Sequence, residues 1–318
     1  VLLRFLSPLQ AHDVLAVLVC CAVVLSAVAY LRAQGTRMGP AILWLAPVTF
    51  NFLLVMGLFH FLLGVAVAFG SVAWWKWQAG SPRARWSGLL VGAILAWYTH
   101  RGSPVLLAIL FLLTLPFGWS PLHLSSKVAR RSSMIGIALL GALLVLGALR
   151  VGPLVQKVTE GIPDELPAFK AASLLRPLFL LDQTKEAWLI HSMAVLLLIS
   201  LAAGVWARWR MGRKPRWHDA LLGLVLGLIL LSWIYGSPTA RKVLIAERCQ
   251  WLALLTFAIW LTAIADARRG WIAWAIGGAA MCALPLHLLR LVQAEGSFAD
   301  LREAHALTME ACHALRPG

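Results

Sequence analysis

Five polar or charged residues stand within or beside long apolar stretches and could bind an anionic group. They are Asn51, His60, His100, Arg101 and Arg248. An Arg guanidinium pairs well with phosphate oxygens, and an ionisable side chain at membrane depth is costly enough to suggest a function. His60 is the clearest such case, because it lies inside the apolar run 52–75. These residues predict a site that binds a phosphate-bearing substrate.

Each of these side chains also has a structural alternative. His60 could be a helix-packing histidine that bonds to a neighbouring carbonyl. Asn51 could cap a helix, a position that Asn favours. Residues 100–101 could form a water-facing turn between two helices, and Arg248 could pair with Glu247. The sequence leaves both sets of roles open.

The sequence supplies no recognisable catalytic or metal-binding motif. Asp164, Glu165 and Asp182 could serve as general bases, but a solvated loop carboxylate is the commoner role for such residues. The five cysteines show no CxxC spacing, which is the pattern typical of metal sites and redox motifs. We therefore assign no catalytic residue and no metal ligand.

The elements that position these residues are predicted to be membrane-spanning helices. The chain is 61% hydrophobic and 13% charged, whereas charged residues make up about 25% of a soluble domain. A span needs about 20 apolar residues. Apolar runs recur at 12–31, 40–50, 52–75, 87–99, 103–118, 133–150, 187–207, 219–235, 249–266 and 271–291. This pattern predicts an all-α polytopic membrane protein with about ten transmembrane or re-entrant helices.

The distribution of charge predicts how the helices are oriented. Fifteen of the 28 Lys and Arg residues lie in five short loops between apolar runs, and only two of the 13 acidic residues accompany them. Short loops of this kind face the cytoplasm. We therefore expect loop 151–186 and the tail 293–318 to lie outside the cytoplasm, with 1–292 forming the membrane domain. Because the loops that hold Arg32 and Lys76 are both predicted to be cytoplasmic, the short run 40–50 must cross or re-enter the membrane.

The net charge of +15 does not indicate nucleic-acid binding. The basic residues flank apolar segments instead of forming one basic face with interleaved aromatic residues. Tryptophans gather at segment ends, as in 74–77 and 206–217, where amphipathic rings settle at the level of lipid headgroups. The predicted partner is therefore the lipid bilayer.

Two pairs of glycines have the spacing that lets membrane helices approach closely. Gly88 and Gly92 form one pair, and Gly223 and Gly227 form the other. Small residues four positions apart are typical of helix interfaces in membranes. We expect both pairs to mark close helix contacts.

Five stretches resemble bacterial multi-pass proteins of the GT-C glycosyltransferase superfamily. They are PVTFNFLLVMGLFHFLLGVAVAF at 47–69, GLLVGAILAWYTHRGSPVLLAILFLL at 88–113, LLRPLFLLDQTKEAW at 174–188, LIAERCQWLALLTFAIWLTAIA at 244–265 and EACHALRPG at 310–318. They fall in matching order and are spread along most of the chain, from residue 47 to residue 318, although each is short. The resemblance implies a multi-pass protein of the bacterial inner (cytoplasmic) membrane.

The same resemblance implies transfer of a sugar from a polyprenyl-phosphate carrier to an acceptor outside the cytoplasm. In that family an Asp or Glu in the first extracytoplasmic loop is the catalytic residue, and that loop would precede Val1, so the chain is expected to be a fragment. His100 and Arg248 would lie near the carrier phosphate or the acceptor. A divalent metal could neutralise the leaving phosphate in some branches.

Two other classes of function remain open. A transporter or flippase of a lipid-linked or anionic substrate would show broken helices in matched positions, and this sequence shows one broken element, near 47–51. A non-catalytic membrane subunit is the second alternative. The sugar, the acceptor and the oligomeric state are not predicted.

Overall fold

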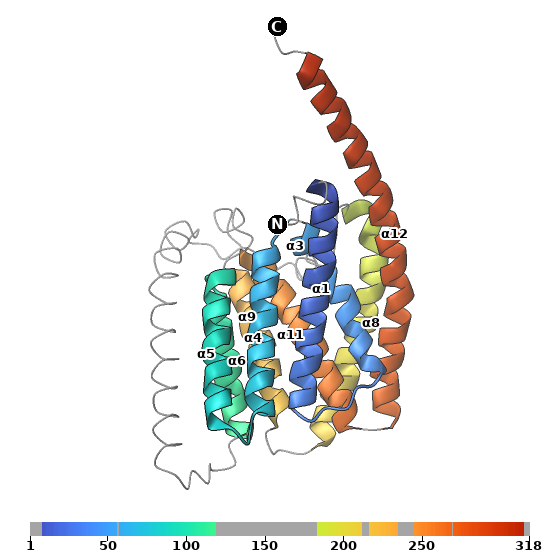
Figure 1. Ribbon diagram of the computed structural model, residues 1–318. Coiled ribbons are helices and arrows are strands. Elements are labelled where there is room, and N and C mark those ends of the chain that lie inside the picture. Colours follow the sequence, from blue (N-terminus) through green and yellow to red (C-terminus); the bar gives the residue numbers. More distant parts are fainter. Residues whose placement is uncertain are drawn as a thin grey trace.

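The computed structural model describes residues 8–55, 57–118, 183–211, 216–234, 245–268 and 270–314. In these ranges every regular element is a helix, so the expected all-α fold is confirmed (Figure 1). The expected span 133–150 and most of the loop 151–186 lie outside the described residues, and so do Asp164, Glu165 and Asp182.

The described helices follow the predicted apolar runs closely. They are α1 (Pro8–Ala33), η2 (Pro40–Trp44), α2 (Leu45–Thr49), α3 (Phe52–Val55), α4 (Phe59–Trp77), α5 (Pro82–Thr99), α6 (Ser103–Gly118), α8 (Gln183–Arg210), α9 (Trp217–Ile234), α11 (Ile245–Ala267) and α12 (Trp271–Ala314). In the described part of the chain, α1, α4, α8, α11 and α12 are each long and apolar enough to cross a bilayer. The protein is therefore an all-helical membrane protein with at least these five candidate spans.

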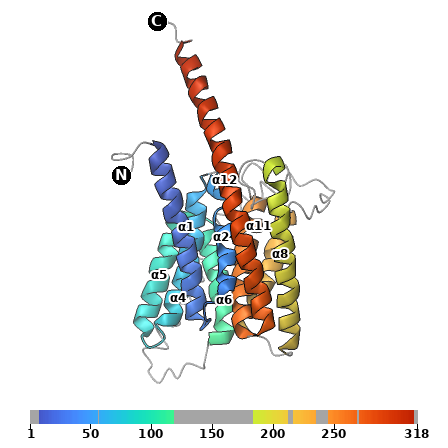
Figure 2. The same cartoon turned by 90° about the vertical axis from the view of Figure 1, so that its right-hand side faces the viewer.

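The long helices stand side by side in one bundle with two chemically different ends (Figures 1 and 2). At the end that we call the basic end, the last turn of α8 meets the start of α9 through Arg208 and Asp219. There too, Asp266 in the last turn of α11 accepts the backbone N–H of Arg37. The other end, which we call the opposite end, holds the starts of α4, α8 and α11 and the end of α5.

Helix α11 lies at the centre of the bundle and contacts α9, α12, α8 and η2. Its Trp251 and Trp260 side chains are fully buried. Buried residues occur all around the circumference of α11. It therefore serves as the support on which the site residues of other helices pack.

The expectation of one uninterrupted helix over 52–75 is wrong. The chain leaves the helix at Phe50, forms the short α3, and turns at Gly57 before α4 begins at Phe59. Gly57 has a φ of 70°, a left-handed conformation that glycine adopts without steric cost. Broken backbone at membrane depth is tolerated only inside protein, and Trp44, Leu45 and Val48 of this element are all buried.

The broken element 40–58 brings the chain back from the basic end to the opposite end. Helices α1 and α4 both begin at the opposite end and run toward the basic end (Figure 1). The segment between them must return across the bundle, as the charge pattern predicted for 40–50. It does so as short helical pieces packed against α12 and α11 rather than as one transmembrane helix.

The two glycine pairs have different surroundings. A Cβ on Gly88 would lie 2.2 Å from the Trp74 ring, and one on Gly92 would lie 1.9 Å from Ser71 Oγ. Among the described residues, Gly223 and Gly227 have no such neighbour within 4 Å. The expected close helix contact is therefore confirmed for the first pair, between α5 and α4, and is not found for the second within the described ranges.

We predict that Gly92→Ala destabilises the protein, whereas Gly227→Ala does not. The new methyl group at residue 92 would force Ser71 to move, and overpacking of this kind costs about 1–3 kcal/mol. At residue 227 the methyl group enters open space, and alanine favours the helix by up to about 1 kcal/mol. Thermal unfolding of the two variants in detergent measures the difference, and equal melting temperatures would contradict this account of the α4–α5 contact.

Helix α12 runs without interruption through the expected boundary between 292 and 293. Its 44 residues include Pro285 and continue to Ala314. Figures 1 and 2 show its second half projecting beyond the opposite end of the bundle. The end of the membrane domain is therefore not marked by the end of a helix.

Candidate functional site

Arg248 and His100 meet at the opposite end of the bundle, although 148 positions separate them in the sequence. Arg248 Nη1 lies 3.1 Å from His100 Nε2. The Phe61 ring lies behind both side chains, with its centroid 5.5 Å from the guanidinium carbon and 5.3 Å from the centroid of the imidazole. The structure thus brings together two of the residues that the sequence predicted for phosphate binding.

The local sequence explains how these two side chains are held. His100 ends α5, and its backbone N–H donates to the Ala96 carbonyl while its own carbonyl accepts from Ser103 at the start of α6. Arg248 lies in the first turn of α11, where unpaired backbone N–H groups favour a negative charge. Trp251, one turn later, packs edge-on against Phe61 and so completes the apolar backing of the pair.

The cluster holds more hydrogen-bond donors than acceptors. The backbone N of Gly102 lies 3.1 Å from His100 Nδ1, at the same time as Arg248 Nη1 approaches Nε2. A neutral imidazole has only one acceptor nitrogen, so one of these contacts must place two N–H groups face to face. The Arg248 Nε group is also buried and has no hydrogen-bond partner among the residues that the structure describes. An anion would supply the acceptors that this cluster lacks.

The charges that act on His100 all oppose its protonation. Burial, and next the charge of Arg248, lower the pKa of His100 to about 4, with smaller contributions from His60 and Arg101. His100 is therefore neutral at pH 7. Among the described residues, Arg248 forms no close ion pair with a carboxylate, although the neighbouring Glu247 attracts it electrostatically.

We predict that acidification destabilises the protein partly through His100. The pKa of histidine is 6.5 when unperturbed and about 4 here, so the unfolded chain binds the proton more readily as the pH falls between these values. Thermal melting at pH 5 should be lower than at pH 7, and His100→Asn should reduce that difference by about 3 °C. An identical pH dependence in the variant would contradict the lowered pKa.

Asn51 has the capping role and not the binding role. Its Nδ2 donates to the carbonyls of Val48 (3.2 Å) and Thr49 (2.7 Å), and its Oδ1 accepts from the N–H groups of Leu53 (2.8 Å) and Leu54 (3.3 Å). An amide offers two donors and two acceptor positions, and all four are used inside the protein. Asn51 therefore builds the break between α2 and α3 and has no hydrogen-bonding capacity left for a ligand.

His60 and Arg101 lie at the rim of the cluster. The expectation that His60 sits at membrane depth inside a long helix is wrong, because the chain breaks at Gly57 and His60 falls in the first turn of α4 with an exposed side chain. Arg101 is also exposed, in the turn after His100. Both act on His100 electrostatically, so they can attract an anion without enclosing it.

A buried arginine that the sequence reading missed lies next to this site. Arg290 of α12 is fully buried, and its Nη2 donates to the carbonyls of Phe50 (2.6 Å) and Pro47 (3.3 Å). It also lies 3.0 Å from His287 Nδ1, and the buried Glu186 at the start of α8 acts on it electrostatically. Arg290 therefore ties the broken element to α12 and α8.

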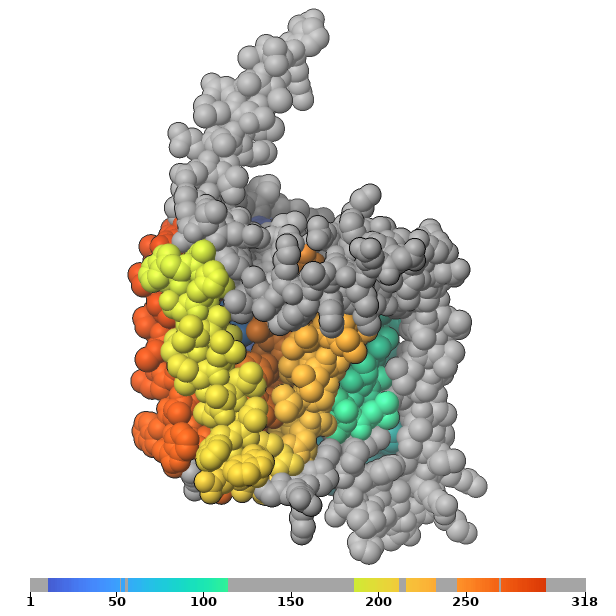
Figure 3. Space-filling model, turned by 180° about the vertical axis from the view of Figure 1, so that it is seen from behind, coloured from blue at the N-terminus to red at the C-terminus, as the bar shows by residue number. Residues whose placement is uncertain are grey.

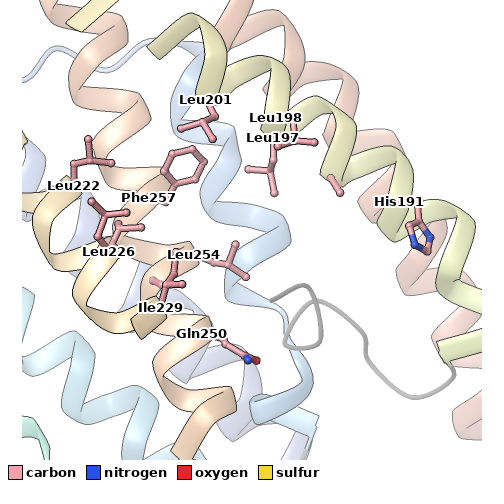
Figure 4. Close-up of a pocket in the computed structure, with 13 residues that line it drawn as sticks. His191, Leu197, Leu198, Leu201, Leu222, Leu226, Ile229, Gln250, Leu254 and Phe257 are labelled. Atoms are coloured by element: carbon pink, nitrogen blue, oxygen red, sulfur yellow. The ribbon is translucent and has the colours of Figure 1, made fainter. Parts of the chain in front are cut away.

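An apolar groove of about 500 Å³ lies between α8 and α9, with α11 as its floor (Figures 3 and 4). Leucines dominate its walls, and His191 and Gln250 are its polar residues. Gln250 is buried, and its Oε1 has no hydrogen-bond partner within the described ranges. A groove of this kind can accept a hydrocarbon chain whose polar end lies near Gln250.

The groove and the Arg248 cluster lie on different sides of α11. Arg248 and Gln250 are two positions apart, and this offset turns their side chains by about 200° around the helix. Both lie in the first two turns of α11, so they are close in depth. A ligand that used both would have to pass over the start of α11.

The described side chains form no metal centre. No three His, Cys, Asp or Glu residues come together among them. The described ranges therefore supply no group of three such ligands for the divalent metal that the resemblance allows.

The chemistry that this end of the bundle can perform is the binding of an anionic group beside a lipid-accessible groove. Comparison with known proteins adds no relative, because no family model, no curated protein and no solved structure matches the sequence.

Proposed function

We propose that the protein binds a polyprenyl-phosphate-linked sugar and takes part in transferring that sugar to an acceptor, as a GT-C-like membrane glycosyltransferase. The observation that carries the proposal is the donor-rich cluster of Arg248 and His100, which has no carboxylate partner among the described residues. A phosphate group supplies several strong acceptors. It would accept from Arg248 and from whichever N–H groups His100 and Gly102 leave unpaired.

The surroundings of the cluster favour a lipid-linked phosphate over a soluble one. The cluster belongs to a bundle with five helices that are long and apolar enough to cross a bilayer. It lies at the opposite end, where α4, α8 and α11 begin. The groove between α8 and α9 opens toward the lipid side of the bundle and is lined by apolar side chains (Figure 3). A long isoprenoid chain could pass over the start of α11 and occupy it.

The proposed orientation puts the basic end in the cytoplasm of a bacterial cell and the Arg248 cluster on the far side of the inner membrane. This orientation is supported by the concentration of Lys and Arg in the loops of the basic end, because such loops face the cytoplasm. In this orientation the carrier phosphate and the acceptor would meet at the opposite end. The residue that deprotonates the acceptor is not assigned.

Binding of the carrier tests the proposal directly. The protein in lipid nanodiscs is titrated with a long-chain polyprenyl phosphate and with the matching polyprenol, which has no phosphate. We expect saturable binding of the phosphate and much weaker binding of the alcohol. Equal binding of the two would show that the chain alone is recognised, and would overturn the assignment of the cluster to phosphate.

A transporter or flippase is the second candidate, and the broken element 40–58 favours it. Transporters bind substrates at discontinuous helices, and Arg290 contacts the carbonyls at this break. The two functions are distinguished by reconstitution in vesicles. Movement of a labelled polyprenyl phosphate across the bilayer would identify a flippase, whereas sugar release from a labelled polyprenyl-phosphate sugar without such movement would identify a transferase.

A further inference from the structure

A second polar cavity lies at the basic end, far from the Arg248 cluster. It has a volume of about 630 Å³ and lies between the last turn of α8, the end of α11 and the start of α12. Its lining consists of Trp206, Arg210, Asp266, Ala267, Arg268, Trp271 and Ile272. Cavities of this size hold small ligands or headgroups. We call it the basic-end cavity.

The arginines near this cavity differ in how they are neutralised. Arg208, outside the cavity, makes a two-pronged ion pair with Asp219, whose Oδ2 lies 2.8 Å from Arg208 Nη2. Arg210, in the cavity wall, forms no ion pair within the described ranges. Its guanidinium instead lies over the Trp206 and Trp209 rings, 4.9 Å and 5.8 Å from their centroids. Stacking uses the face of the guanidinium and leaves its N–H groups available for an anion.

The single carboxylate of the lining is already engaged. Asp266 Oδ2 accepts the backbone N–H of Arg37 at 2.9 Å, so Asp266 holds the loop after α1 against α11. Arg268 lies at the end of α11, is exposed, and has no ion pair in the part of the chain that the structure describes. Two guanidinium groups against one carboxylate leave the cavity with a net positive charge.

The tryptophans around the cavity place it at the level of lipid headgroups. Trp209, Trp271 and Trp274 are 70%, 66% and 73% exposed. Exposed tryptophans at the ends of membrane helices settle at the boundary between headgroups and acyl chains. Figure 3 shows the end of α8 beside the start of α12 at this end of the molecule. A phosphate at this depth is therefore most readily supplied by a lipid.

We propose that the basic-end cavity binds the headgroup phosphate of an anionic phospholipid from the adjoining leaflet. Arg210 and Arg268 donate to the phosphate oxygens, and the Trp206 and Trp271 rings flank the glycerol and the upper acyl carbons. Basic pockets between membrane helices are suited to this class of lipid. The site is independent of the carrier site at the opposite end, and its ligand is a component of the bilayer and not a substrate.

The test is lipid-dependent stability of the purified full chain. Delipidated protein in detergent is titrated with phosphatidylglycerol, with zwitterionic phosphatidylcholine and with inorganic phosphate, and thermal unfolding is followed. Phosphatidylglycerol should raise the melting temperature, since a ligand that binds only the folded state stabilises it. Native mass spectrometry counts the lipids that remain bound. The variant Arg210→Gln/Arg268→Gln should bind phosphatidylglycerol at least about tenfold more weakly.

A matched control separates the cavity from the general charge of this end. Arg32→Gln/Arg83→Gln removes two exposed arginines from the same end but outside the cavity, and it should keep the wild-type response. Arg210→Lys/Arg268→Lys keeps both charges and serves as the test variant if the Gln variant does not fold. It should bind phosphatidylglycerol more weakly than wild type but more tightly than the Gln variant. Equal responses in all variants, an equal gain from phosphatidylcholine, or a full gain from inorganic phosphate alone would overturn the proposal.

Discussion

Replacing Arg248 with Ala is expected to weaken binding of a polyprenyl phosphate by about 10–100-fold. A hydrogen bond to a charged group contributes about 1.5–3 kcal/mol, and each 1.4 kcal/mol corresponds to about tenfold in affinity. Arg248 Nη1 lies against His100, and its buried Nε has no hydrogen-bond partner in the described part of the chain, so the substitution should remove at least one bond to the phosphate. Titration of the variant in nanodiscs with the phosphate and with the polyprenol measures the effect.

The controls for Arg248→Ala use the charges at the other end of the bundle. Arg83→Ala removes an exposed arginine from α5 at the basic end and should leave carrier binding unchanged. His100→Asn should weaken binding less than Arg248→Ala, because a neutral donor contributes less than a charged one. A variant of Arg248 that is folded and binds the phosphate as tightly as wild type would remove the basis of the proposed function.

Replacing Arg290 with Met is expected to destabilise the fold by about 3–5 kcal/mol, the cost of removing one partner from a buried charge pair. The substitution leaves the carbonyls of Pro47 and Phe50 without this donor and removes a positive charge that interacts electrostatically with the buried Glu186. Unfolding should be measurable as a fall of about 10 °C in the melting temperature in detergent. Weaker anchoring of the broken element 40–58 should also make its backbone amides exchange faster with solvent.

Two further variants show whether the buried charge is the cause. Adding Glu186→Gln to Arg290→Met should recover part of the lost stability, because the second substitution removes the buried negative charge that Arg290 attracts. Arg101→Met removes an exposed arginine from the same end and should change the melting temperature little. A melting temperature of Arg290→Met equal to wild type would show that the broken element is held by other contacts.

Much of the helical framework could be predicted because hydropathy reports directly on membrane-spanning segments. The runs 87–99 and 103–118 correspond to α5 and α6, and the intervening turn at His100 is where the sequence placed it. Arg248 could also be singled out as a candidate phosphate ligand, because it stands at the start of an apolar helix. Its contact with His100 could not be predicted, because it depends on how α5 packs beside α11.

The features that the sequence did not predict share a physical cause. Hydropathy is averaged over a window of residues, so it does not report the backbone conformation of a single residue. The sequence indicated a break near 47–51 but not the turn at Gly57, because one glycine costs a helix only about 1 kcal/mol. Arg290 was absorbed into the predicted span 271–291 as its penultimate residue. A histidine three positions before it, at His287 on the same helix face, was the available signal of a buried polar cluster.

The unbroken α12 has a mechanical consequence for whatever its far end contacts. From Arg290 to Ala314 the helix extends about 36 Å at 1.5 Å per residue, and its base is bonded to the carbonyls of the broken element. A tilt of about 5° at Arg290 would displace the tip by about 3 Å, given that rise per residue. A rigid α12 would therefore convert a small shift of residues 47–50 into a larger displacement of its C-terminal end, beyond the opposite end of the bundle.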